Sequence, residues 1–263
     1  MCLILFAHKA HPEYSLVLAA NRDESYVRPT APAGFWPDYP HVCGGRDLDQ
    51  GGTWLGITRS GSIAAITNYR DVNAAKLSTR SRGELVANYL CGNQGPGPYV
   101  AQLQNQIGTY NGFNLIAGNV DALHYLSNRG GEAMPIAPGV HGLSNQQLNT
   151  PWPKVERGTK LLAELLEIRS PMLIERLFDM LGERTVAADD KLPDTGVGLP
   201  RERVLSPAFI AAPAYGTRSS TIILVDYHGQ VELIERSFGQ NGISTGSVSL
   251  RFALAAMPAP VTA

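Results

Sequence analysis

The chain has 263 residues, of which 44% are hydrophobic and 17% are charged, and its formal net charge is −1. These values are ordinary for a soluble globular protein, and we expect one domain over residues 1–263. A nucleic-acid-binding surface needs clustered basic side chains, whereas the 22 Lys and Arg residues are scattered along the chain. The composition therefore gives no reason to expect nucleic acid as a partner.

The cysteines and the N-terminal residues indicate the compartment. Cys2, Cys43 and Cys91 cannot complete a disulfide framework, and no CxxC pair suggests a metal site. The apolar run after Met1 stops at His8, with neither the basic segment nor the cleavage site of a signal peptide. No stretch is long enough to span a bilayer. We expect a cytoplasmic protein with no metal and no integral membrane segment; a disulfide between two of the cysteines stays open.

The first third of the chain has the pattern of strands. Apolar runs at 2–7 and 16–20 predict a hairpin whose first strand begins at the N-terminus. Residues 28–50 are rich in Pro, Gly and Asp, which predicts a long irregular loop. Residues 54–57 and 62–67 predict a second hairpin.

Helices and strands alternate in the rest of the chain. Helical spacing predicts helices at 83–91 and 99–107. Thr150-Pro151 is typical of a helix start, and Pro171 begins a second helix that runs to Leu181. Further strands are predicted at 113–117, 122–127, 221–225 and 231–235, and an acidic loop at 187–199. This order favours a layered α+β domain over βαβ winding.

Cys2 is the most informative single residue. Methionine aminopeptidases remove Met1 when the second residue is small, which would leave Cys2 at the N-terminus. Its thiol then lies beside an α-amine with a pKa of roughly 7.7–8.0, so that one residue supplies both nucleophile and general base. The alternative is a small residue that begins a buried strand. Cys43, in a glycine-rich segment, is expected to be exposed, and Cys91 to be buried.

Polar residues follow the second strand abruptly. Arg22 and Asp23 stand between Asn21 and Glu24, directly after the apolar run 16–20. If the strand continues, some of these side chains face the interior, and an Arg–Asp pair beside Cys2 would hold its thiolate and orient its amine. The alternative is a turn, where Asn and Asp are common.

Three later polar residues also stand beside predicted strands. Asn68 follows the strand at 62–67, and Asn145 follows Gly142-Leu143-Ser144. Their side-chain amides are candidate donors to an oxyanion, with turn formation as the alternative. Arg218 precedes the strand at 221–225 and is a candidate for binding a substrate carboxylate, or else it solvates a loop.

The predicted loop at 28–50 carries the aromatic residues Phe35, Trp36 and Tyr39. A loop that follows the second strand would fold over the Cys2 end of the domain and give a ligand site an apolar wall. The alternative is ordinary packing of these side chains against the sheet.

Several segments, taken in chain order, resemble the NRDE family, also called the transport and Golgi organisation protein 2 family. They are Met1-Cys2, residues 18–24, 51–57, 67–69, 82–86, 110–115, 142–145, 150–152 and 215–218. The resemblance covers nearly the whole chain. It implies a link to haem handling or to lipid and acyl-CoA metabolism.

A more distant resemblance is to N-terminal-nucleophile (Ntn) hydrolases of the choloylglycine hydrolase and penicillin acylase kind. It implies a four-layer αββα sandwich. It also implies a site whose places are filled, in the same chain order, by Cys2, Arg22, Asp23, Asn68, Asn145 and Arg218. The adjacency of Arg22 and Asp23 departs from the wider pattern, in which the two residues are not always neighbours.

Two functions follow as expectations. The first is hydrolysis of an amide or thioester bond in a small apolar acyl compound, with Cys2 as nucleophile, Asn68 and Asn145 as oxyanion donors, and Arg22 and Asp23 setting the electrostatics. Residues that would bind the substrate are Phe35, Trp36 and Tyr69. The alternative is a non-catalytic carrier on the same fold that binds haem or an acylated lipid. The hydrolase needs no cofactor, and in the carrier haem would be the ligand.

Overall fold

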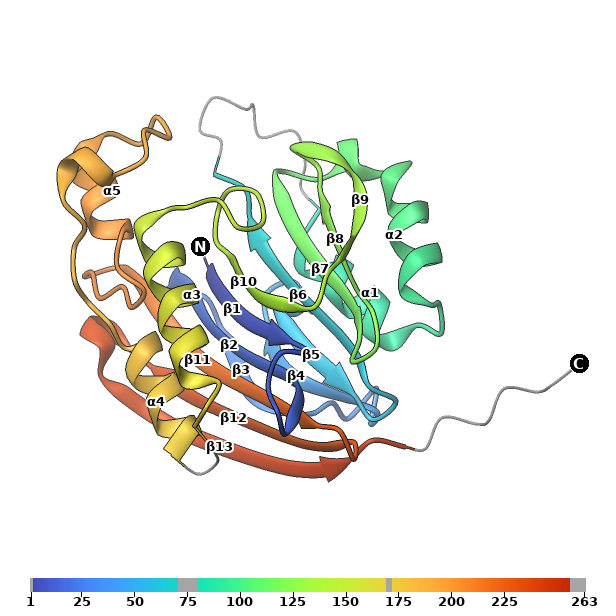
Figure 1. Ribbon diagram of the computed structural model, residues 1–263. Helices are drawn as coiled ribbons and strands as arrows, with labels where there is room; N and C mark the ends of the chain where they lie inside the picture. Colours follow the sequence, from blue (N-terminus) through green and yellow to red (C-terminus); the bar gives the residue numbers. More distant parts are fainter. Residues whose placement is uncertain (1, 71–79, 169–171, 256–263) are drawn as a thin grey trace, which may run out of the picture.

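Two antiparallel sheets pack face to face in the computed structural model, which describes residues 2–70, 80–168 and 172–255 (Figure 1). The strands of the first sheet are β1 (Cys2–His8), β2 (Tyr14–Ser25), β10 (Gly139–Leu143), β11 (Tyr215–Asp226), β12 (Gln230–Phe238) and β13 (Ser244–Ala253). They lie in the order β10-β1-β2-β11-β12-β13.

The second sheet has seven strands in chain order, from β3 to β9. They are β3 (Thr30–Phe35), β4 (Val42–Asp47), β5 (Leu55–Thr58), β6 (Ser62–Asn68), β7 (Phe113–Asn119), β8 (Leu123–Ser127) and β9 (Gly130–Ile136). Each pairs antiparallel with the next.

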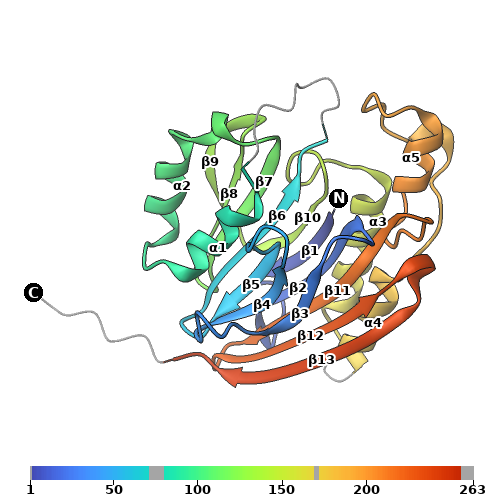
Figure 2. The same cartoon turned by 180° about the vertical axis from the view of Figure 1, so that it is seen from behind.

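Helices cover the outer face of each sheet (Figures 1 and 2). The helices α1 (Gly83–Cys91) and α2 (Pro96–Gln104) pack on the second sheet, and α3 (Pro153–Leu165) and α4 (Met172–Leu181) pack on the first. A short helix, α5 (Leu199–Leu205), lies between α4 and β11 in the chain. The layers therefore run helix, sheet, sheet, helix, which confirms the predicted αββα sandwich.

Because both faces of the first sheet are covered, its inner strands are apolar on both sides. Along β1, Ile4 and Phe6 belong to the core between the sheets, whereas Leu3 and Leu5 pack toward α3 and α4. Side chains alternate between the faces of a strand, so burial on both faces produces a continuous apolar run. This is why residues 2–7 resemble a signal peptide at first sight.

The predicted irregular loop at 28–50 is wrong, because most of it forms β3 and β4. Its glycines serve close packing: a Cβ on Gly44 would lie 2.5 Å from the carbonyl oxygen of Leu55 on the neighbouring strand. Pro32 is tolerated because β3 is at the sheet edge. Pairing with the rest of the sheet overrides the local composition here.

The other predicted elements are found, most with altered ends. The two early hairpins form, although β2 extends to Ser25 through the polar residues. The third helix begins at Pro153 after Trp152, two residues later than predicted and with no side-chain cap. The predicted start of the next helix at Pro171 lies outside the described residues. No sequence pattern predicted β9, β10, β13 or α5.

Within the described part of the chain, no helix has the length and apolar character needed to cross a membrane.

Candidate active site

Cys2 lines a cavity of about 320 Å³ at one end of the sandwich. The cavity lies where β1 begins and where β2 and β6 end, so side chains from both sheets reach it. Four arginines are among its lining residues: Arg22, Arg28, Arg80 and Arg82. Trp54 and Ile66 supply its apolar side chains. The cavity is therefore mainly polar, in contrast to the apolar wall that the sequence suggested.

Arg22 lies directly opposite Cys2 on the neighbouring strand, so the two side chains share one face of the sheet. Arg22 is 5% exposed. Its guanidinium lies 4.2 Å from the ring centroid of Trp54, and its Nη1 donates a hydrogen bond to Thr30 Oγ1 at 3.1 Å. These contacts fix a positive charge next to the thiol.

Asp23 points to the other face of β2, toward the helices. It is 1% exposed and accepts a hydrogen bond from Thr217 Oγ1 at 2.7 Å. Burial raises the pKa of Asp23, and the ammonium of Lys154 works against that increase. Consecutive strand residues face opposite sides, so Arg22 and Asp23 approach Cys2 from different faces of β2, but both line the Cys2 cavity.

Burial also raises the pKa of the Cys2 thiol, and the Asp23 carboxylate raises it further. The Arg22 guanidinium and a hydrogen bond from the Asp23 backbone N–H act in the opposite direction. Arg22 thus favours the thiolate as expected, but burial has the larger effect.

The two candidate oxyanion donors take different places. Asn68 ends β6 and lines the cavity. Asn145 is fully buried, and its Nδ2 donates to the Asn68 carbonyl oxygen at 2.8 Å. The neighbouring Ser144 donates from Oγ to the Cys2 carbonyl oxygen at 3.1 Å. Asn145 is close to the site but is not among the residues that line the cavity.

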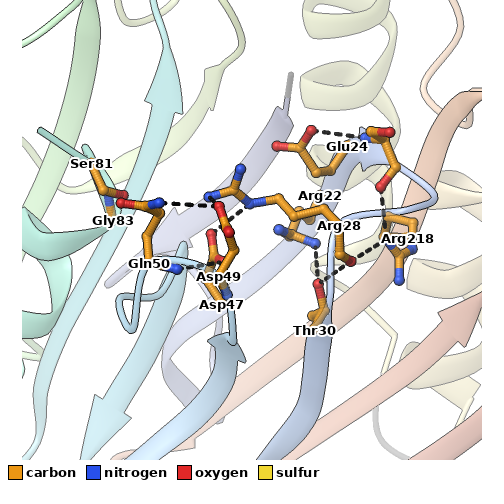
Figure 3. Close-up of polar contacts among 11 residues, drawn as sticks. Arg22, Glu24, Arg28, Thr30, Asp47, Asp49, Gln50, Ser81, Gly83 and Arg218 are labelled. Carbon is orange, nitrogen blue, oxygen red and sulfur yellow. Dashed lines mark hydrogen bonds and ion pairs between the residues drawn. The ribbon is translucent and has the colours of Figure 1, made fainter. Parts of the chain in front are cut away.

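Arg218 lies on β11 and does not line the Cys2 cavity. Its Nη1 donates to the carbonyl oxygens of Ser25 and Arg28, at 2.8 and 3.0 Å, which holds the turn after β2 (Figure 3). In the same view Arg28 pairs with Asp47 at 2.8 Å and with Asp49 at 3.3 Å.

The aromatic residues expected to bind substrate also lie away from the cavity lining. Trp36 is buried, and its Nε1 donates to the Gly44 carbonyl oxygen at 3.0 Å. Phe35 packs edge-to-face against Phe252, with 5.1 Å between ring centroids. Tyr69 continues from Asn68, and its backbone N–H donates to Gly112. Phe35 and Trp36 therefore follow the alternative interpretation, in which these aromatic side chains pack against the sheets.

Sequence reasoning missed a buried polar cluster on the helix side of the site. Lys154 is 4% exposed and donates from Nζ to the Leu205 carbonyl oxygen at 3.1 Å. Burial lowers its pKa to about 8, whereas the Asp23 carboxylate favours its charged form. Arg70 and Glu202 form an ion pair of 2.6 Å, with side chains 7% and 3% exposed. Because these residues come from separate elements, no local pattern shows that they meet.

Cys43 and Cys91 do not have the accessibility predicted from the sequence, which was exposed for Cys43 and buried for Cys91. Cys43 is fully buried, and burial raises its pKa to about 12, whereas Cys91 is half-buried. All three cysteines are free. No cluster of His, Cys, Asp or Glu suited to a metal ion occurs among residues 2–70, 80–168 and 172–255.

The fold is that of the Ntn hydrolases. A solved structure with this arrangement is the C2A mutant of conjugated bile acid hydrolase from Clostridium perfringens, with a TM-score of 0.51 and 8% identity over 95% of this chain and 92% of that one. At this identity the likeness establishes the fold alone.

Sequence comparison defines the family. The model of "Transport and Golgi organisation 2" matches residues 1–240, and the chain belongs to this family. The transport and Golgi organization protein 2 homologs of Bos taurus and Homo sapiens are each 38% identical to it, over 90% and 93% of this chain and 93% and 95% of theirs. The Drosophila melanogaster protein is 28% identical over 90% of this chain and 92% of its own.

Proposed function

We propose that the protein is an N-terminal-cysteine hydrolase that cleaves an amide or thioester bond of an acyl compound. The observation that carries this proposal is the placement of Cys2 in the lining of a cavity, directly opposite the buried Arg22. A nucleophile at the first position of a strand, open to a cavity and beside a fixed cation, has what acyl transfer requires.

The steps follow from the residues around Cys2. Once Met1 is removed, the α-amine of Cys2 accepts the thiol proton, and the sulfur attacks the acyl carbon. The amine or thiol leaving group takes that proton, and water then cleaves the acyl-enzyme to release the acid and regenerate Cys2. Asn68, which lines the cavity, is a candidate donor to the oxyanion in both steps. Arg22 stabilises the thiolate that forms first.

The structural neighbour supports the choice of reaction class, since it is named a conjugated bile acid hydrolase. The cavity itself supports a polar acyl compound over an apolar one, because charged and amide side chains make up most of the lining. The substrate part of the proposal therefore departs from the sequence-based expectation of a wholly apolar acyl group.

The test combines intact mass with activity. We expect purified protein to lack Met1 and to hydrolyse members of a panel of acyl amides and thioesters, and we expect Cys2→Ala to abolish turnover. A lysine inserted between Met1 and Cys2 blocks removal of Met1 and leaves every other side chain in place. Full activity of that insertion variant would show that the α-amine is not the base, and full activity of Cys2→Ala would overturn the proposal.

A further inference from the structure

A second cavity, of about 280 Å³, lies beside the first between the two sheets. Trp54 lines both cavities. A hydrogen bond also joins them, because Arg22 lines the first, Thr30 lines the second, and Arg22 Nη1 donates to Thr30 Oγ1. The two cavities therefore share a wall made by these three side chains.

The floor of the second cavity continues the strand row that begins at Cys2. Cys2 pairs with Arg22 on β2, and Arg22 pairs with Ser219 on β11. Ser219 pairs with Ser237 on β12, and Ser237 pairs with Gly246 on β13. Paired residues point to the same face of a sheet. The row thus runs from the nucleophile under Arg22 to three small residues that leave the second cavity open.

The strand row also gives the distance between Cys2 and the second cavity. Neighbouring strands are about 4.8 Å apart, so Ser219 lies two strands, or roughly 10 Å, from Cys2. Ligand sites commonly have volumes of roughly 300–1,000 Å³, and each cavity alone is near the lower end of that range. A ligand that fills both would be of ordinary size.

Strand irregularities converge on the second cavity. The register of β11 against β2 shifts between Thr217 and Ser219, and that of β12 against β13 shifts between Ser237 and Phe238. The pairing of β3 with β4 is interrupted between Ala31 and Gly34, at the lining residue Pro32. Such irregularities release backbone groups from the ladder and occur often beside active sites.

One buried hydroxyl group in this lining, that of Ser219, is only weakly bonded within the protein. Ser219 is 4% exposed, and its Oγ has no partner at hydrogen-bonding geometry in the described part of the chain. It acts as a weak donor to the Glu235 carboxylate and lowers the pKa of that group, against the larger effect of burial, which raises it. Glu235 already accepts hydrogen bonds from the Ala33 N–H at 2.7 Å and from Thr221 Oγ1 at 2.9 Å. Because Glu235 already has two close donors, the Ser219 hydroxyl is available to bond to a ligand group in the cavity.

The remaining lining defines the chemistry of that group. Hydroxyls come from Thr30, Ser237, Thr245 and Ser247, and the charges of Arg218 and Glu235 are of opposite sign. Hydroxyl groups both donate and accept hydrogen bonds, and the balanced charges favour neither an anion nor a cation.

We infer that the second cavity is a subsite for the end of the acyl group remote from the scissile bond, and that this end is an uncharged hydrogen-bonding group, a hydroxyl or a primary amide. This inference rests on the proposed hydrolysis at Cys2 for the identity of the scissile bond. It adds that the acyl chain passes the Arg22–Trp54 wall and ends about 10 Å or more from Cys2.

Closing the cavity tests the subsite. A Cβ on Gly246 would meet no atom within 4 Å, so Gly246→Trp can fill the space without a backbone clash. Ser249→Trp is the matched control, since Ser249 is exposed on the same strand and is not part of the lining. Ser219→Ala removes the Ser219 hydroxyl alone.

The probes are 4-nitroanilides and 4-nitrothiophenyl thioesters of acids that differ only at the remote end: methyl, hydroxyl or carboxamide. We expect the unaltered protein and Ser249→Trp to prefer a hydroxyl or carboxamide end over methyl in kcat/KM, by about tenfold or more. In Gly246→Trp the ratio of kcat/KM for polar-ended over methyl-ended probes should fall close to one, mainly because KM for the polar-ended probes rises. Ser219→Ala should reduce the same ratio a few-fold, as expected for one hydrogen bond. A stronger response to hydroxyl or to carboxamide identifies the group.

The possible outcomes distinguish failure of the subsite proposal from failure of the hydrolase proposal. Turnover that requires Cys2 but shows no preference for the remote end, or a preference that Gly246→Trp leaves intact, overturns the subsite and leaves the hydrolase standing. If no probe is hydrolysed, equilibrium dialysis of the same nitroanilides against Cys2→Ala protein decides. Polar-ended probes that bind, and lose binding in the Cys2→Ala, Gly246→Trp double variant, support the subsite while the hydrolase proposal fails. Equal binding of all three end groups overturns the subsite.

Discussion

The side-chain amide of Asn145 donates a hydrogen bond to the backbone carbonyl oxygen of Asn68 over 2.8 Å, and this bond joins the two sheets. Asn145 follows β10 of the first sheet, whereas Asn68 ends β6 of the second. Thr67 Oγ1 donates to the Ser144 carbonyl oxygen next to it, at 2.5 Å. Asn145 thus fixes the position from which Asn68 reaches the cavity.

The two asparagines should respond differently to replacement by alanine. Asn145→Ala removes a buried sheet-to-sheet hydrogen bond and should lower the free energy of unfolding by about 1–3 kcal/mol. Asn68→Ala should leave stability nearly unchanged and reduce turnover by roughly 10²–10³ if Asn68 donates to the oxyanion. Urea unfolding and steady-state kinetics on both variants measure this. The opposite pattern, with Asn68→Ala unstable and active, would contradict the assignment.

Glu202 should be important for stability through Arg70. The pair is buried, and Glu202→Gln would leave the guanidinium without its carboxylate in a poorly solvated place. We expect a loss of about 3–5 kcal/mol in the free energy of unfolding. Asp189→Asn, which breaks an ion pair whose partners are 47% and 52% exposed, is the control and should be nearly neutral. Equal effects of the two substitutions would show that burial does not strengthen the Arg70 pair.

Lys154 should give stability a distinctive pH dependence. Its folded-state pKa of about 8 lies below the ordinary 10.5, so between these values the unfolded chain binds more protons than the folded one. The contribution of this group is therefore complete above pH 10.5 and is lost as the pH falls through 8. A displacement of this size corresponds to about 3 kcal/mol.

The comparison of Lys154→Met with the unaltered protein isolates this effect. The difference in unfolding free energy between the two should change with pH between 8 and 10.5, as measured by urea unfolding at a series of pH values. Lys160→Met, at an exposed position of the same helix, should show no such trend. A difference for Lys154→Met that is constant across this range would show that its ammonium is not buried as described.

These residues show what the sequence reveals and what it does not. The strand pattern around Cys2 and the polar end of β2 are local, so the hairpin and the pairing of Cys2 with Arg22 could be expected. The side to which Asp23 points depends on how far β2 continues, which is set by its pairing with β11. The partners of Asp23 on the helix side come from remote segments. The same holds for Trp36, whose burial depends on β3 and β4 pairing despite their Pro and Gly content.

Cys2 should be the first cysteine to react with a limiting amount of iodoacetamide once Met1 is removed. Cys43 is fully buried with a pKa raised to about 12, whereas Cys2 and Cys91 are both half-buried and burial raises the pKa of both. Cys2 differs from Cys91 in lining the first cavity beside Arg22, where a reagent can reach the thiol. Arg22→Gln removes a charge that lowers the pKa of Cys2, so the thiolate fraction and the labelling rate at pH 8 should both fall. Peptide mapping by mass spectrometry measures both effects. Faster labelling of Cys91, or an unchanged rate in Arg22→Gln, would contradict this description.

Trp54, rather than Trp36, should be the tryptophan that reports and supports ligand binding. Trp54 lines both cavities and lies under the guanidinium of Arg22, whereas Trp36 lies under that of Arg46 and lines neither. Trp54→Phe should weaken binding of a polar-ended acyl nitroanilide severalfold, because it removes part of the wall against which the chain lies. Trp36→Phe should leave that affinity unchanged and lower stability instead, because the indole Nε1–H that binds the Gly44 carbonyl oxygen is lost. Equilibrium dialysis against Cys2→Ala protein gives the affinities, and urea unfolding gives the stabilities. A loss of affinity in Trp36→Phe, with Trp54→Phe unaffected, would place the ligand beside Trp36, directly after β3, and outside both cavities.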